Sequence, residues 1–129
     1  MPLRVLVVDD SRAMRVAIQR VLDLSCLPLK CFTAQHGNAA LSLLQNQEID
    51  LMLVDLNMPE MSGSDLIRRL QENPVERQIP FIVISADATA TRIEEMLNLG
   101  AVAYIHKPFD PSTLRTEMRR ALDEMHARN

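Results

Sequence analysis

Residues 50–59 read DLMLVDLNMP, and this stretch decides the fold. Its apolar residues run continuously rather than alternating with polar ones, which is typical of a strand buried on both faces of a parallel sheet. Asp55 follows the apolar run directly, and Asn57 and Pro59 then mark a turn. The stretch therefore predicts a central strand over Asp50–Val54 that ends in a carboxylate.

Four further apolar runs resemble this strand, and stripes of apolar residues with helical spacing separate the runs. The runs are Leu3–Val8, Leu29–Thr33, Pro80–Ile84 and Val102–Ile105. The stripes are Met14, Ile18, Val21 and Leu22; Ala40, Leu41 and Leu44; Leu66, Ile67 and Leu70; Ile93, Met96 and Leu97; and Leu114, Met118, Ala121, Leu122 and Met125. We interpret each stripe as the core face of a helix. Five alternations of strand and helix predict a single α/β domain over residues 1–129, with a doubly wound five-stranded parallel sheet and five helices.

Two glycines carry conformational expectations. Gly100 follows the fourth stripe and is expected to end that helix in a left-handed conformation. Gly63 precedes the third stripe and is expected to supply a positive φ in a turn.

Composition excludes several classes of protein. A formal net charge of -3 argues against direct binding of nucleic acid or of an anionic membrane, since both require an excess of basic residues. No apolar run approaches the ~20 residues of a membrane span, and the N-terminus lacks the features of a signal peptide. We therefore expect a cytoplasmic protein. Cys26 and Cys31 are too few for a disulfide framework or a zinc site, so both are expected to be reduced.

Polar side chains gather where the predicted strands end. The first strand leads into Asp9 and Asp10, the third into Asp55, the fourth into Ser85 and the fifth into Lys107. In doubly wound sheets ligands bind outside these carboxyl ends. Neighbouring carboxylates favour a hard cation such as Mg²⁺, while an ammonium and a hydroxyl can bind phosphoryl oxygens. Together the groups suit formation of an aspartyl phosphate.

Each of these residues alone has a plainer interpretation. The plainer roles are a helix N-cap for Asp10, Ser11 or Ser85, a turn cap for Asp55, and an exposed position for Lys107. The arrival of all these groups at successive strand ends favours a shared site over five separate structural roles.

The order and spacing of these motifs resemble the receiver domain of two-component response regulators, in the CheY-like group. The matching segments are Val7–Asp10, Val54–Pro59, Met61, Gly63, Ile84–Ala86 and Lys107–Phe109. The resemblance covers Val5 to about Met125, and it implies a flavodoxin-like sheet with strand order 2-1-3-4-5.

The resemblance also implies a role for each matching residue. Asp55 is the expected phosphoacceptor, and Lys107 is the expected phosphate-binding lysine, with a cis bond to Pro108. Ser85 is the expected hydroxyl switch residue, in place of the more frequent threonine, and Tyr104 is the expected aromatic switch residue. The expected ligands of Mg²⁺ are Asp10, Asp55, the backbone carbonyl of Asn57 and, through water, Asp9.

The function that the resemblance implies is a signalling phosphoacceptor rather than an enzyme acting on other substrates. A histidine kinase or a histidine phosphotransfer protein would supply the phosphoryl group. The fourth helix, fifth strand and fifth helix would then change their binding to a partner. The chain ends at Asn129, soon after the last helix, so we expect a stand-alone regulator or a receiver cut from a longer protein. A homodimer that forms on phosphorylation is a further expectation.

Two rival classes stay open. A phosphohydrolase with an Asp nucleophile would turn over phosphate esters, but such enzymes of the haloacid dehalogenase type carry Asp-x-Asp after the first strand, whereas Asp55 follows the third. A pseudo-receiver would bind a partner without Mg²⁺, and the intact Asp9–Asp10 pair, Asp55 and Lys107 argue against it.

Two residues bear on the lifetime of a phosphorylated state. Asn57 and Asp87 follow Asp55 and Ser85 by two positions, and neither is bulky and apolar. Because both can hydrogen-bond water, we expect rapid loss of the phosphoryl group. The alternative for Asp87 is that it simply caps the fourth helix.

Overall fold

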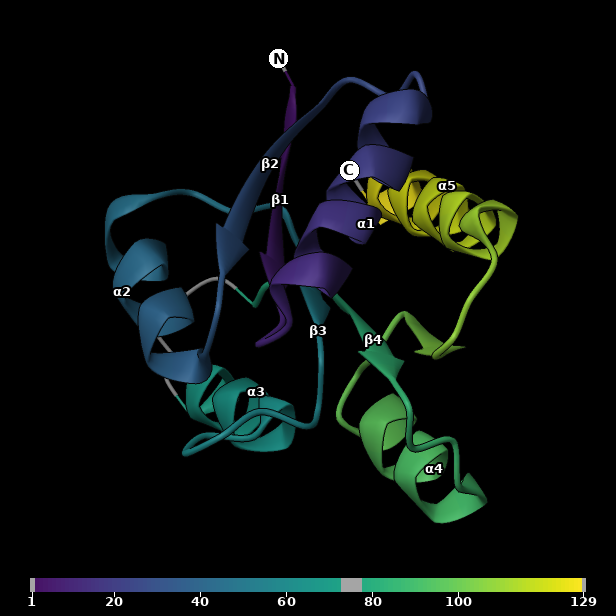
Figure 1. Cartoon of the computed structure of the whole chain (residues 1–129). Coiled ribbons are helices and arrows are strands. Elements are labelled where there is room, and N and C mark those ends of the chain that lie inside the picture. Colours follow the sequence, from purple (N-terminus) through teal and green to yellow (C-terminus); the bar gives the residue numbers. More distant parts are fainter. Residues whose placement is uncertain (1, 73–77, 129) are drawn as a thin grey trace.

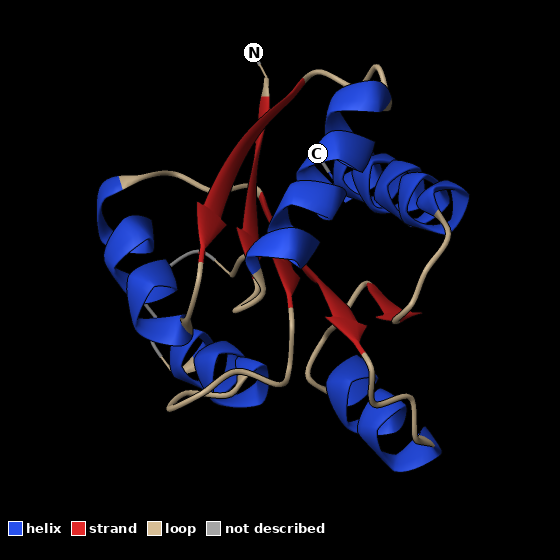
Figure 2. Ribbon diagram, in the orientation of Figure 1, coloured by secondary structure: helices blue, strands red, loops and turns tan. Residues whose placement is uncertain are grey.

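The computed structural model describes residues 2–72 and 78–128. Strands and helices alternate strictly along the described chain (Figure 1). They are β1 (Leu3–Val8), α1 (Arg12–Leu24), β2 (Leu29–Ala34), α2 (Gly37–Asn46), β3 (Leu51–Val54), α3 (Gly63–Gln71), β4 (Phe81–Ser85), α4 (Ala90–Asn98), β5 (Ala103–His106) and α5 (Pro111–Arg128). The five strands form one parallel sheet in the order β2-β1-β3-β4-β5, drawn as red arrows in Figure 2. The predicted fold class and strand order are confirmed.

The sheet separates two apolar clusters, one on each face. On one face α1 and α5 lie against Val5 and Val7 of β1, and on the other α2, α3 and α4 lie against Leu6 and Val8 (Figure 1). These four residues of β1 are all fully buried. A strand covered on both faces needs apolar residues at every position, which is why the central strands read as continuous apolar runs.

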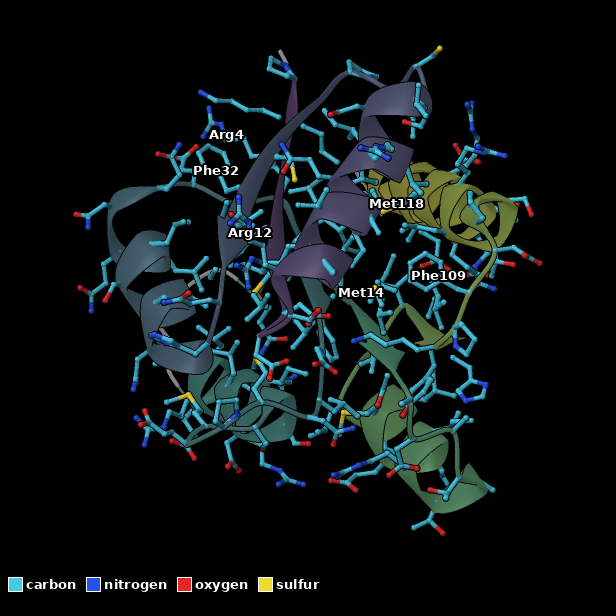
Figure 3. All side chains as sticks on the ribbon, viewed as in Figure 1. Arg4, Arg12, Met14, Phe32, Phe109 and Met118 are labelled. Atoms are coloured by element: carbon cyan, nitrogen blue, oxygen red, sulfur yellow. The ribbon has the colours of Figure 1, made fainter. Side chains whose placement is uncertain are left out.

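Side chains from distant parts of the sequence complete the cluster under α1 and α5. Met118 of α5 is fully buried there. Met14 of α1 and Phe109, from the segment after β5, pack against the same cluster (Figure 3). The first and last helices of the chain are therefore held together by a shared core rather than by local contacts.

The observed strands β4 and β5 end one residue later than predicted. Ser85 pairs with His106 at the end of these strands. The prediction followed apolar content, whereas backbone pairing decides where a strand ends. Ser85 is therefore the last residue of β4, and its position is held by the sheet.

The prediction of a core position is wrong for one residue of α4. Leu97 of α4 is 48% exposed, although its spacing placed it in the apolar stripe of that helix. Met96 is fully buried and makes the core contact instead. Adjacent residues lie about 100° apart around a helix, so a short helix on the sheet edge can bury one of the pair and expose the other.

The two glycine expectations have opposite outcomes. Gly100 has φ +105 and follows the C-cap of α4, as predicted. Gly63 is the first residue of α3, and the positive φ of this segment belongs to Glu60, at φ 66. A Cβ on Gly63 would lie 2.2 Å from the Asp55 carbonyl oxygen. Glycine is required there by the close approach of α3 to the end of β3, so the predicted reason was wrong.

Two remaining expectations concern the cysteines and the membrane. Cys26 and Cys31 are both free. Burial, with the nearby Asp23 carboxylate, raises the pKa of the Cys31 thiol to about 11, which keeps it protonated and unreactive. None of the described helices combines the length and the apolar character that a membrane crossing requires.

Candidate functional site

Parallel pairing brings the acidic residues together at one edge of the sheet. Val8 of β1 lies beside Val54 of β3, and the Asp55 N–H donates to the Val8 carbonyl at 2.9 Å. The residues that follow, Asp9 and Asp55, are therefore neighbours although 46 residues of sequence separate them. Carboxylate oxygens of Asp9, Asp10 and Asp55 all lie within 4.8 Å of one another.

Burial makes this acidic cluster electrostatically costly. Asp9 is 1% exposed and Asp55 is 5% exposed, while Asp10 is exposed. Lys107 supplies a cation from the end of β5. Its Nζ lies 2.8 Å from Asp9 Oδ2 and 3.6 Å from Asp55 Oδ1. Lys107 thus lies inside the cluster rather than on the open surface, and its ammonium pairs with two of the three carboxylates.

The protonation equilibrium of Asp55 reflects these neighbours. Burial raises the pKa of the Asp55 carboxyl, the Lys107 ammonium opposes that shift, and Asp9 and Asp10 add to it. The Asn57 N–H donates to Asp55 Oδ1 at 3.2 Å and lowers the pKa again. Burial has the largest effect, so the ionised carboxylate is destabilised relative to the same group in water.

The donor set fits a hard divalent cation. All of the grouped atoms are carboxylate oxygens, two of the carboxylates are buried, and their charge exceeds that of Lys107. Mg²⁺ binds through one or two carboxylates while keeping several waters, and exposed Asp10 leaves room for those waters. The backbone carbonyl of Asn57, predicted as a further ligand, belongs to a loop that folds back onto Asp55 through the Asn57 N–H.

The N-caps of the helices leave the site residues free for other contacts. Ser11 Oγ accepts from the Met14 N–H and caps α1, so Asp10 is not its cap. Thr89 caps α4, which removes that role from Ser85 and Asp87. Of the plainer roles considered, the N-cap role of Ser11 and the turn contact between Asp55 and Asn57 are present.

Ser85 and Tyr104 lie together beside the loop that connects β4 to α4 (the β4–α4 loop, residues 86–89). Ser85 is fully buried, and its Oγ accepts from the Asp87 N–H at 3.1 Å. The Tyr104 hydroxyl donates to the Asp87 carbonyl. Burial raises the pKa of this hydroxyl, and its interaction with the Ser85 hydroxyl opposes the shift. The two predicted switch residues therefore share Asp87 as a partner, Ser85 through its N–H and Tyr104 through its carbonyl.

The two residues predicted to control lifetime have different surroundings. Asn57 is exposed next to Asp55. The Asp87 carboxylate accepts from the Thr89 N–H at 3.1 Å, and this hydrogen bond lowers its pKa. Its second oxygen lies 3.9 Å from Arg92 Nε. Asp87 is thus engaged with the start of α4, although Thr89 is the capping residue.

Two contacts at the site were missed by the sequence reasoning. Arg15 of α1 donates to the Asp9 carbonyl at 2.7 Å, and His106 Nε2 lies 3.2 Å from the Ala86 carbonyl oxygen. No pattern marked Arg15. The only signal for His106 was its place directly before Lys107, whose bond to Pro108 is cis as expected.

Comparison with known proteins gives consistent matches. The family model for the response regulator receiver domain matches residues 5–119. The two-component response regulator ORR3 of Oryza sativa subsp. indica is 34% identical over 119 residues, covering 92% of this chain and 89% of that protein. The chemotaxis protein CheY-3 of Vibrio cholerae is 30% identical over 124 residues, covering 95% and 94%. A CheY-like receiver domain protein from Methanospirillum hungatei has a TM-score of 0.86 at 26% identity, with 100% of both chains covered.

Proposed function

Because the chain belongs to the response regulator receiver domain family of two-component systems, we propose that it is a phosphoacceptor in which Asp55 receives the phosphoryl group. The observation that carries this assignment is the position of Asp55. It is a buried carboxylate at the end of a central strand, within reach of two further carboxylates and of the Lys107 ammonium.

The transfer requires one bond to form and one to break. An Asp55 carboxylate oxygen forms a bond to phosphorus while the bond from phosphorus to a histidine nitrogen of the donor breaks. The leaving imidazole keeps the electron pair and takes up a proton. The product is an acyl phosphate, which is known chemistry for an aspartate side chain. The donor is a histidine kinase or a histidine phosphotransfer protein, and a small phosphodonor can replace it.

The residues around Asp55 suit this reaction. Mg²⁺, held by Asp10, Asp55 and the Asn57 carbonyl with Asp9 acting through water, would neutralise charge on the transferring group. The Lys107 ammonium, which now pairs with Asp9, is close enough to pair with a phosphoryl oxygen on Asp55. The Ser85 hydroxyl can donate to another phosphoryl oxygen.

A change of surface would follow from the added charge. Phosphorylation places about -1.5 to -2 charge on Asp55. A hydrogen bond from the Ser85 hydroxyl to the phosphoryl group would alter the hydrogen bonding at Asp87, which Ser85 and Tyr104 share. Tyr104 belongs to β5, so the face formed by α4, β5 and α5 would shift between two populated states and change its affinity for an output protein, for an output domain or for a second copy of this chain. Such a phosphorelay component would act in the cytoplasm.

The lifetime of the phosphorylated state depends on access of water to phosphorus. Asn57 is exposed and has no apolar side chain to shield an acyl phosphate. Asp87 contacts Thr89 and Arg92, so its effect on water would act through the β4–α4 loop. We propose a short-lived phosphorylated state, which Asn57→Met would prolong more than Asp87→Leu.

The test of the assignment is phosphorylation of purified protein by acetyl phosphate and Mg²⁺. Intact-mass spectrometry should show one added phosphoryl group that hydroxylamine removes. Asp55→Asn should abolish it, whereas Asp65→Asn, which changes an exposed carboxylate on α3, should not. Full phosphorylation of Asp55→Asn would overturn the proposal. Turnover of generic phosphate esters would point to a phosphohydrolase, and absence of both Mg²⁺ binding and phosphorylation would point to a pseudo-receiver.

A further inference from the structure

Three successive backbone carbonyl groups, at the end of β4 and the start of the β4–α4 loop, contact residues of β5 and Lys107. The Ser85 carbonyl accepts from the Lys107 N–H at 2.8 Å. The Ala86 carbonyl oxygen lies 3.2 Å from His106 Nε2, and the Asp87 carbonyl accepts from the Tyr104 hydroxyl. Two of the three donors are side chains. They belong to alternate residues of β5, which places them on the same side of the sheet.

The His106 contact acts on the peptide unit that restrains Ser85. Because a carbonyl oxygen can only accept, His106 Nε2 carries the hydrogen in this contact. The Ala86 carbonyl and the Asp87 N–H belong to one planar peptide unit. His106 holds the oxygen of that unit, and its N–H donates to Ser85 Oγ at 3.1 Å. Rotation of this peptide would therefore move both contacts together.

We infer that His106 is a positioning residue for phosphoryl transfer: its ring orients the peptide between Ala86 and Asp87 and thereby holds the Ser85 hydroxyl in place. This inference rests on the proposed function, in which the Ser85 hydroxyl donates to a phosphoryl oxygen. A donor that is already oriented costs no reorganisation when charge develops on the transferring group. His106 itself touches neither Asp55 nor the phosphoryl group.

Position in the strand makes this role specific to His106. It pairs directly with Ser85 in the β4–β5 ladder, so the strand itself sets its distance from the loop. Its side chain is exposed, and its ring hydrogen-bonds the Ala86 carbonyl. An exposed ring that is not needed for the core can be replaced without disturbing the fold, which makes the role open to test.

The test uses His106→Phe, which keeps a ring without the N–H, and His106→Gln, which keeps an N–H donor. Rates of phosphorylation by acetyl phosphate and of subsequent decay are measured in both. Loss of the single hydrogen bond should slow both rates by about three- to tenfold in His106→Phe. His106→Gln should restore most of the rate. Mg²⁺ affinity should stay at the wild-type value, because the metal ligands are untouched.

A double-mutant cycle separates positioning from a merely structural role. In a Ser85→Ala background His106→Phe should have no further effect on either rate, since the hydroxyl that it positions is gone. An equal slowing in both backgrounds would overturn the inference. So would wild-type rates in His106→Phe, or a His106→Gln as slow as His106→Phe.

A second measurement decides the inference even if the wild-type protein is not phosphorylated, a result that would refute the proposed function alone. Amide hydrogen exchange of Asp87 reports directly on its hydrogen bond to Ser85. Exchange at Asp87 should be faster in His106→Phe and close to wild type in His106→Gln. Unchanged exchange in His106→Phe would mean that the ring does not hold this peptide.

Discussion

At the scale of single residues, the buried carboxylates of the site lower the stability of the folded domain. Asp55 loses most of its hydration through burial and lies beside Asp9 and Asp10. Lys107 offsets part of this cost, and its nearest partner is Asp9 rather than Asp55. A reactive carboxylate with only partial compensation suits a group that has to attack phosphorus.

Replacing Asp55 should therefore stabilise the metal-free protein. Burial raises the folded-state pKa of Asp55, so the folded state binds this proton more tightly than the unfolded state does. The stabilising effect of the proton is fully present below the unfolded pKa, near ~4, and is lost as pH rises through the folded pKa. Asparagine does not ionise, so Asp55→Asn avoids the destabilisation that ionisation of Asp55 causes at pH 7. It should raise the free energy of unfolding at pH 7 by about 1 kcal/mol. Urea unfolding without divalent cations between pH 4 and pH 8 measures this, and a difference that grows toward low pH would contradict it.

Replacing Lys107 should have the opposite effect on stability. Lys107→Met keeps most of the side-chain length but leaves Asp9, which is 1% exposed, without its ammonium partner. Removing one partner of a buried ion pair costs about 3–5 kcal/mol. Urea unfolding of Lys107→Met is the measurement, with Lys30→Met as the matched control. Lys30 is exposed and lies 5.4 Å from the centre of the Phe32 ring, so that control should stay within about 1 kcal/mol of wild type.

At the scale of the element, the start of α3 lies against the end of β3 and so helps to position Asp55 of the acidic cluster. Gly63 begins α3, and its N–H donates to the Leu56 carbonyl at 3.1 Å. The helix thus starts directly against the backbone of the residue after Asp55. Backbone atoms, unlike flexible side chains, cannot move aside without displacing the strand end.

Gly63→Ala should consequently destabilise the protein and disturb the site. The added Cβ would lie 2.2 Å from the Asp55 carbonyl oxygen, so α3 or the end of β3 must move. We expect a loss of about 2–4 kcal/mol, at the upper end of the effects of overpacking. Thermal or urea unfolding measures it. Gly37→Ala is the matched control, because Gly37 also begins a helix, but the three atoms nearest to its added Cβ all belong to the Met61 side chain, which can adjust more readily than backbone. Equal losses in the two variants would contradict this account.

At the scale of the whole molecule, five strand-helix units build one edge of the sheet, where the ends of β1, β3, β4 and β5 bring together carboxylates, a hydroxyl and an ammonium. The sheet order puts β1 and β3 side by side and β4 next to β3, so the contributing residues come from Asp9 to Lys107. Global folding creates the site, since the contacts of Asp55 with Asp9 and of Lys107 with both carboxylates join residues that are far apart in the sequence. Ligands that bind the site therefore stabilise the entire fold.

Mg²⁺ should stabilise the folded protein by mass action. At a free concentration 100 times the dissociation constant, the gain is about 2.7 kcal/mol. Thermal melts over a Mg²⁺ series measure it. Asp10→Asn should remove most of the gain, while Asp50→Asn, at the opposite end of β3, should retain it. A full Mg²⁺ response in Asp10→Asn would exclude Asp10 as a ligand.

Sequence by itself determined the class of fold and which polar residues lie at the carboxyl ends of the strands. Continuous apolar runs specify buried strands and helical stripes specify covering helices, because both depend on residue spacing that any tertiary structure must respect. Asp9, Asp10, Asp55, Ser85 and Lys107 were found because each follows or ends such a run. The strand order came from the resemblance of the motifs, since periodicity carries no information about which strands pair.

Tertiary structure alone decided which groups touch. In the structure Lys107 pairs with Asp9, and Leu97 is exposed. Glycine is needed at position 63 because the Asp55 carbonyl oxygen lies close to it, and not because of a positive φ. His106 also contacts the Ala86 carbonyl. Distances between atoms far apart in the sequence depend on how strands and helices pack in three dimensions, and that packing is a property of the whole chain rather than of any local pattern.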